Sequence, residues 1–152
     1  MATTKPAELK KKYFTAEEAN RALPLVKVIV GDIVRQFQSV QELRQRLAAV
    51  VTEHRRPSGD PYSEELAQSQ AELESQESKL EGFIDELSKL GVELKGPDGL
   101  CDFYSIMDGR EVYLCWRLGE PEVLHWHELN EGVAGRHPLT ASAVGRKGHR
   151  VN

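Results

Sequence analysis

Four residues of the types that bind transition metals lie within 27 positions of one another: Cys101, Cys115, His125 and His127. Thiolate and imidazole groups are ligands that zinc prefers in proteins. The chain contains no CxxC pair. The predicted strand pairing also places Cys115 on the opposite face of a sheet from the histidines. The expectation is therefore a protein without a cofactor, in which Cys101, His125 and His127 are the candidate ligands should zinc bind.

A cysteine nucleophile is the second chemistry to consider. Cys115 is expected opposite Asp102 and lies two residues before Arg117, whose charge can lower the pKa of a thiol. The same pairing leaves no histidine on that face to serve as the general base. We interpret Cys115 as a small apolar residue. The sequence leaves enzymatic activity open and favours a protein that is not an enzyme.

The third candidate is an anion site in the loop from Gly132 to His137, whose pattern is Gly-x-x-Gly-Arg-His. Backbone amides and the Arg136 guanidinium can bind a phosphate in such a loop. The alternative function is thus a small metal- or anion-binding protein, or an enzyme, with its site in the sheet and this loop. The candidate functional patch comprises Asp102, Cys115, Arg117, Glu120, Trp126, His127, Glu128 and Arg136.

A long helix that must support these residues is predicted from residue 15 to about residue 56. Thr15 and Glu18 have the spacing of a capping box. The apolar residues that follow recur at steps of three and four, as in a coiled coil. Pro24 removes one backbone donor and should kink or restart the helix. We therefore expect residues 15–23 to form a separate short arm.

A second helix is predicted to run back along the first and to end at Gly91. The intervening break, with its tip near residues 55–61, contains two prolines and a glycine, so the helices should form an antiparallel hairpin. Residues 60–90 carry a net charge of −7 and residues 15–56 a net charge of +2, which favours this pairing. Ser69 and Gln76 interrupt the apolar seam, so we expect a protein partner or self-association to cover it.

After Gly91 the apolar period changes to two, which predicts a small antiparallel sheet of three or four strands. Asp108-Gly109 is expected to be a two-residue hairpin turn, because both positions of such a turn favour positive φ. This turn pairs Phe103 with Leu114, Asp102 with Cys115, and Cys101 with Trp116.

The loop of residues 119–122 sets the pairing of the next strand. Joining Leu118 to Val123 directly places His125 opposite Trp116 and His127 opposite Leu114. The predicted core face then carries Cys101, Phe103, Val112, Leu114, Trp116, Leu118, Val123, His125 and His127. The opposite face, rich in aromatic residues, carries Asp102, Tyr104, Ile106, Glu111, Tyr113, Cys115, Arg117, Leu124, Trp126 and Glu128. Such an aromatic face is expected to meet a partner.

The expected fold class is therefore α+β, with a long antiparallel, coiled-coil-like helical hairpin followed by a small antiparallel sheet. We expect residues 1–14 to form a flexible N-terminal segment and residues 15–91 to form the hairpin. We expect residues 92–139 to form the sheet region with its following loop, and residues 140–152 to form a flexible basic tail.

The composition restricts the functional class. The 152 residues carry a net charge of −4, and no window approaches the roughly 18 apolar residues of a membrane helix. We expect a cytoplasmic protein that does not enter a membrane. The near-neutral charge, and basic pairs such as Arg55-Arg56 without an aromatic platform, argue against nucleic acid. The best guess is a non-enzymatic protein-interaction module using the hairpin and the aromatic sheet face.

Three stretches of sequence carry a resemblance to a known family: FTAEEANRALPLV, GVELKGPDGLCDFYSIMDGREVYLCWRLGEPEVLHWHEL and GVAGRHPL. Together they span Phe14 to Leu139. The chain resembles a bacterial family of uncharacterised proteins, domain of unknown function twenty-two-oh-three. The resemblance implies no assigned activity, cofactor or catalytic residue. Its most specific part runs from Cys115 to Leu129, which places the emphasis on the sheet.

Overall fold

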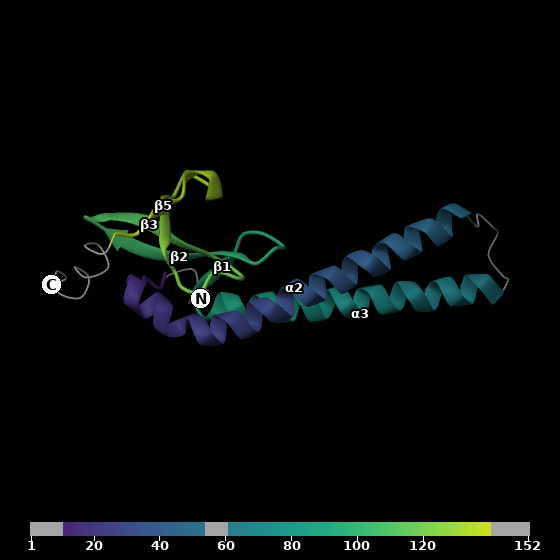
Figure 1. The fold of residues 1–152 in the computed structure, drawn as a ribbon. Helices are drawn as coiled ribbons and strands as arrows, with labels where there is room; N and C mark the ends of the chain where they lie inside the picture. Colours follow the sequence, from purple (N-terminus) through teal and green to yellow (C-terminus); the bar gives the residue numbers. More distant parts are fainter. Residues whose placement is uncertain (1–10, 54–60, 141–152) are drawn as a thin grey trace, which may run out of the picture.

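Two long helices form an antiparallel hairpin in the computed structural model, which describes residues 11–53 and 61–140. Helix α2 spans Ala16–Glu53 and helix α3 spans Pro61–Lys89. The two helices extend together away from the sheet (Figure 1). The predicted hairpin is therefore confirmed. The predicted hairpin tip, N-terminal segment and basic tail lie largely outside the described residues.

The start of α2 is fixed by the predicted capping box. The Thr15 amide donates to Glu18 Oε1 and the Glu18 amide donates to Thr15 Oγ1, both at 3.0 Å. The separate arm expected at residues 15–23 is wrong, because α2 continues through Pro24. Proline removes one backbone donor from the helix, while the buried Leu23 holds this part of α2 in the core.

Five antiparallel strands follow the hairpin, one more than the largest number expected, and they pair in chain order. Their bounds are Val92–Leu94 for β1, Leu100–Met107 for β2, Arg110–Arg117 for β3, His125–Glu128 for β4 and His137–Pro138 for β5. A short 3-10 helix, η1, occupies Val133–Gly135 between the last two strands. The fifth strand has only two residues. An alternating apolar pattern cannot be recognised over so short a segment, so the sequence did not predict this strand.

The β2–β3 pairing agrees with the prediction. Asp108 and Gly109 have φ values of 52° and 81°, as a turn with two left-handed residues requires. Asp102 consequently lies directly opposite Cys115.

The predicted β3–β4 pairing is wrong by one residue. His127 lies opposite Tyr113 and His125 lies opposite Cys115, while Trp126 takes the position opposite Leu114. Because side chains alternate between the faces of a sheet, this shift exchanges the two faces of β4.

The shift arises in the loop before β4, which takes in Leu118. The Leu118 amide donates to the Gly99 carbonyl at 3.1 Å. The Glu120 amide donates a hydrogen bond to the Arg117 carbonyl at 2.9 Å, which closes a turn, and Gly119 within this turn has a φ of 107°. The connection between β3 and β4 therefore runs from residue 118 to residue 124, seven residues where four were assumed.

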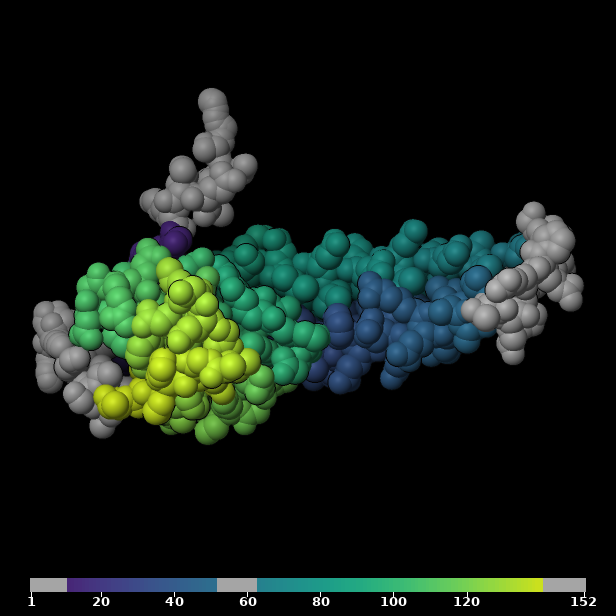
Figure 2. Space-filling view, turned by 90° about the horizontal axis from the view of Figure 1, so that it is seen from above, coloured from purple at the N-terminus to yellow at the C-terminus, as the bar shows by residue number. Residues whose placement is uncertain are grey.

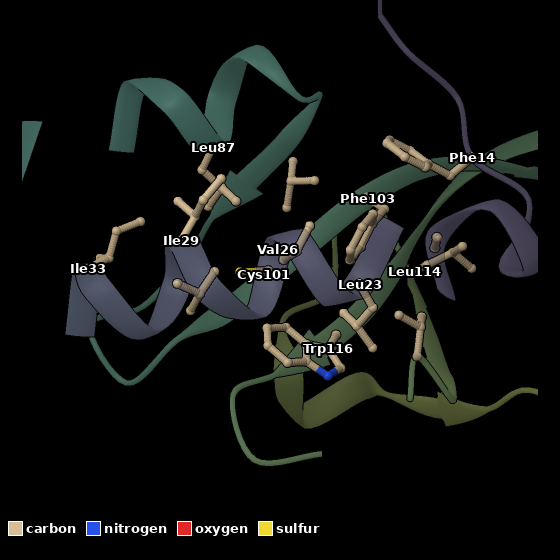
Figure 3. Close-up of a cluster of buried hydrophobic side chains, with 14 residues drawn as sticks. Phe14, Leu23, Val26, Ile29, Ile33, Leu87, Cys101, Phe103, Leu114 and Trp116 are labelled. Carbon is tan, nitrogen blue, oxygen red and sulfur yellow. The ribbon is translucent and has the colours of Figure 1, made fainter. Parts of the chain in front are cut away.

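The core lies between one face of the sheet and the N-terminal half of α2 (Figure 3). Val26 and Val30 of α2 are fully buried in the cluster that contains Phe103 and Trp116 of the sheet. Leu87 is the one side chain of α3 that is buried among the described residues. The sheet thus rests mainly on α2, and α3 contributes only its C-terminal end.

None of the helices that the structure describes combines the length and the apolar character required to cross a bilayer.

Candidate functional site

Three buried side chains with metal-binding and acid–base chemistry meet on the sheet face that points away from α2. We call Asp102 of β2, Cys115 of β3 and His127 of β4 the buried trio. Their exposed fractions are 3%, 0% and 3%. One carboxylate oxygen, the sulfur and one ring nitrogen all lie within 4.8 Å of one another. Seen from above, the C-terminal part of the described chain lies over this face (Figure 2).

Hydrogen bonds fix the orientation of the His127 ring. Its Nδ1 lies 2.8 Å from the backbone carbonyl of Glu128, and a carbonyl only accepts, so Nδ1 donates. Its Nε2 lies 3.1 Å from Asp102 Oδ1. Two lone pairs would repel at that distance, so Nε2 and Oδ1 hold one proton between them. The pair can exchange a proton without moving its heavy atoms.

Burial controls the charges of the trio. It raises the pKa of the Asp102 carboxyl, against the hydrogen bond from His127, which lowers it. Burial and the neighbouring Asp102 charge raise the pKa of the Cys115 thiol to about 11. Cys115 is therefore a thiol at neutral pH. Asp102 hydrogen-bonds to both His127 and Cys115. A cysteine nucleophile instead needs a histidine hydrogen-bonded to its sulfur, so this arrangement does not favour a nucleophilic Cys115.

A lysine and a tyrosine line the approach to the trio. Lys95 Nζ lies 3.8 Å from Asp102 Oδ2 and 3.2 Å from Glu93 Oε1. The same ammonium lies 4.7 Å from the centre of the Tyr113 ring, whose centre is 5.3 Å from that of His127. The Lys95 side chain is 37% exposed, whereas that of Asp102 beside it is 4% exposed.

A second cluster lies beside Cys115 in the loop before β4 and in the segment before β5. Arg136 donates from Nη1 and Nη2 to the two carboxylate oxygens of Glu120, both at 2.8 Å. Its Nη2 also lies 3.3 Å from the Cys115 carbonyl. Glu120 Oε1 accepts the Arg117 amide at 2.8 Å. The Arg136 guanidinium is thus already paired with a carboxylate.

A family model described as "Uncharacterized conserved protein (DUF2203)" matches residues 12–139. The chain belongs to the DUF2203 family. No curated protein and no solved structure matches the DUF2203 chain. The match includes all five strands and both helices, so the buried trio and the Glu120–Arg136 pair lie inside the family domain.

The predicted patch of the DUF2203 chain divides into two groups. Its members Asp102, Cys115, Arg117, Glu120, His127 and Arg136 gather on or beside the sheet face away from α2. Trp126 packs instead against the core, and Glu128, paired with Arg110, lies on the same side of β4. Of the candidate zinc ligands, Cys101 is buried on the core face. Cys101 therefore cannot join His127. Cys115 shares the face of His127 instead, because the shift in the β3–β4 register moves the histidines to that face.

Sequence reasoning missed Lys95 and Tyr113 as neighbours of the trio. The turn residues Gly96-Pro97-Asp98-Gly99 could have predicted the position of Lys95. A hairpin closed by that turn pairs Glu93 with Asp102, which sets Lys95 on the Asp102 face. The position of Tyr113 was predicted, but its contact with His127 depends on the β3–β4 register.

Proposed function

We propose that this DUF2203 protein is a non-enzymatic interaction module whose helical hairpin pairs with the hairpin of a second copy. One observation carries the proposal. Between Val40 on α2 and Leu87 on α3, no described side chain of the hairpin is buried. A pair of helices leaves part of a wide apolar stripe exposed, and a four-helix bundle buries such a stripe around a common core.

The far part of the hairpin carries an apolar groove of about 320 Å³. It is lined by Leu43, Arg46, Leu47 and Val50 of α2 and by Glu65, Leu66 and Ser69 of α3. The leucines in it are half-buried rather than buried. The groove lies where the polar Ser69 interrupts the seam, and the pair Gln36–Gln76 makes the middle of the hairpin polar as well.

The charges of the groove are self-complementary. Helix α3 carries eight acidic residues against two lysines, and one ion pair, Arg44–Glu77 at 2.7 Å, joins the helices within the described residues. A two-fold axis along the hairpin would place α2 of each copy against α3 of the other. The Arg46 wall of one groove then meets the Glu65 wall of the partner, as a symmetric interface requires.

The aromatic sheet face gives the module a second surface. Tyr13, Tyr104 and Tyr113 follow one another across this face, with ring centres 6.3 Å and 4.9 Å apart. Lys11 lies over the Tyr104 ring. We place the module in the bacterial cytoplasm, where its two free cysteines would stay reduced. The alternative, an anion site in the Gly132–His137 loop, has less support because Glu120 already binds Arg136.

The oligomeric state of the full chain tests the proposal. Light scattering behind size exclusion, over a wide range of concentration, should give the mass of a dimer. Leu47→Glu should convert it to a monomer while circular dichroism shows an unchanged helix content. The matched control Leu124→Glu changes an exposed leucine outside the groove and should leave the dimer intact.

Charge exchange separates pairing between copies from a general loss of packing. Arg46→Glu and Glu65→Arg should each weaken the dimer, and the double variant should restore it. A wild-type chain that stays monomeric at all concentrations would overturn the proposal, as would a dimer unaffected by Leu47→Glu.

A further inference from the structure

We propose that Asp102, Cys115 and His127 form a binding site for a zinc ion, on the sheet face opposite the core. The inference goes beyond the interaction function and does not rest on the hairpin. It starts from one geometric fact: a carboxylate, a thiol and an imidazole, all buried, present one ligand atom each within 4.8 Å of one another.

The backbone fixes the positions of all three ligands. Asp102 and Cys115 lie directly opposite each other on β2 and β3. His127 lies opposite Tyr113, two residues before Cys115, on the neighbouring strand. Ligands on three adjacent strands of one sheet are held more rigidly than ligands on loops.

The distances are close to those of a zinc site. Zinc binds nitrogen and oxygen at about 2.0–2.2 Å and sulfur at about 2.3 Å, so ligand atoms in a tetrahedral site lie roughly 3.3–3.8 Å apart. The Nε2 of His127 and Oδ1 of Asp102 are 3.1 Å apart. The sulfur needs to approach by no more than about 1–1.5 Å, a side-chain adjustment.

The hydrogen bonding of His127 is that of a metal ligand. Histidines that bind metals usually donate the other ring N–H to a carboxylate or a backbone carbonyl, which fixes the tautomer. Nδ1 of His127 donates to the Glu128 carbonyl, and Nε2 points to Asp102 and the rest of the trio. A rotation of the ring is not required for binding.

The charge balance also suits a divalent ion in a buried place. Zinc would displace two protons to solvent, the Cys115 thiol proton and the proton held between His127 and Asp102. The resulting Asp102 carboxylate, Cys115 thiolate and neutral His127 carry two negative charges, which the zinc ion cancels. The site would then hold no net charge, and a buried group without net charge avoids the main cost of burial. The mixed sulfur, nitrogen and oxygen donors fit zinc better than magnesium or calcium, which prefer oxygen alone.

Two further residues support the assignment. His125 lies directly opposite Cys115, and its Nδ1 is buried without a hydrogen-bond partner among the described residues. Its ring nitrogens lie outside the 4.8 Å group of the trio, so His125 would have to move toward the ion to fill a fourth coordination position. Lys95 places its ammonium 3.8 Å from Asp102 Oδ2 and so supplies the positive charge that zinc would replace.

Cobalt binding by the full-length chain tests the site, because a cobalt–thiolate bond absorbs in the near ultraviolet. The protein, prepared without an affinity tag and stripped with a chelator, should develop this band with one equivalent of Co²⁺ and lose it on adding Zn²⁺. Cys115→Ala should abolish the band. The matched control Cys101→Ala removes the other buried thiol, on the core face, and should keep it.

Affinity measurements keep the test decisive where a variant folds poorly. Changing even an outer-shell partner of a metal costs about 10–100-fold in affinity, so Asp102→Asn should weaken zinc binding by at least about tenfold. Lys95→Met leaves all three ligands in place and removes a competing cation, so it should strengthen binding.

Absence of the cobalt band in the wild type would overturn the inference, and so would a band that survives in Cys115→Ala. Weaker binding by Lys95→Met would do the same. These readouts do not depend on the mass of the protein, so the zinc site and the hairpin dimer can fail separately.

Discussion

His127 Nε2 lies 3.1 Å from Asp102 Oδ1, and both residues are 97% buried. This contact joins β2 to β4 across the intervening strand β3, from which Cys115 projects between them. A polar contact in so buried a place should have a large effect on stability, because its partners cannot turn to water.

Removing one member of this pair should destabilise the protein strongly. His127→Ala leaves the Asp102 carboxyl buried without its main partner, and breaking a buried pair costs about 3–5 kcal/mol. Urea unfolding of the chelator-treated protein measures the loss. Ile106→Ala, at a side chain that is 51% exposed on β2, should cost less than about 0.5 kcal/mol. Equal costs for the two variants would contradict the energetic role of the pair.

The Glu120–Arg136 pair should make stability depend on pH on the acid side. The two hydrogen bonds from Arg136 lower the pKa of Glu120 in the folded state. As the pH falls, the unfolded chain therefore binds this proton first. The contribution of the pair is complete above the ordinary pKa of a glutamate and is lost as the pH falls through the folded pKa.

Glu120→Gln should consequently be less stable than the wild type at pH 7, by about 1.5–3 kcal/mol. The difference should shrink when unfolding is measured in strong acid. A difference that stays constant with pH would show that Glu120 acts through shape rather than through charge.

Both thiols should react slowly in the native protein. Burial raises the pKa of Cys101 to about 12 and that of Cys115 to about 11, and both side chains are fully buried. A chromogenic disulfide reagent at mild alkaline pH should detect almost no thiol in the chelator-treated native protein and two thiols after unfolding. Rapid reaction of Cys115 in the native state would indicate an accessible thiolate and revive a nucleophilic role.

The turn between β2 and β3 should be sensitive to backbone conformation alone. Gly109 has a φ of 81°, and no atom lies within 4 Å of a Cβ built there. Gly109→Ala should therefore cost about 1–2 kcal/mol through the left-handed conformation. Gly82→Ala, at an equally open position inside α3, should instead stabilise the protein by about 0.8–1 kcal/mol. Thermal unfolding distinguishes these opposite signs.

Local sequence patterns were sufficient to predict the elements that begin at a helix-capping residue or meet at a tight turn. Thr15 and Glu18 located the start of α2, and Asp108-Gly109 fixed the β2–β3 register. Helix α2 does not restart at Pro24, because the packing of the helix around Leu23 in the core outweighs the loss of one backbone hydrogen bond.

The site could be predicted only in part, for a reason of register. The Asp102–Cys115 pair followed from the Asp108-Gly109 turn. His127 was assigned to the wrong face because the loop of residues 118–124 is longer than the four residues assumed and shifts the pairing of β4 by one residue. The turn residues in the sequence of this loop predict that the chain reverses there, but they do not fix how many residues the loop contains. A shift of one residue in the β3–β4 register thus decides whether His127 lies in the core or beside Asp102 and Cys115.

The position of the core also has a consequence for synthesis on the ribosome. Val26 and Val30 of α2 are covered by Phe103, Trp116 and Val123, which are translated after the whole hairpin. At about 5–20 residues per second, the apolar stripe near the start of α2 remains exposed for roughly 4–20 seconds before the sheet residues that cover it have been synthesised. The length of the hairpin therefore sets the time during which the nascent chain is exposed to aggregation or needs a chaperone.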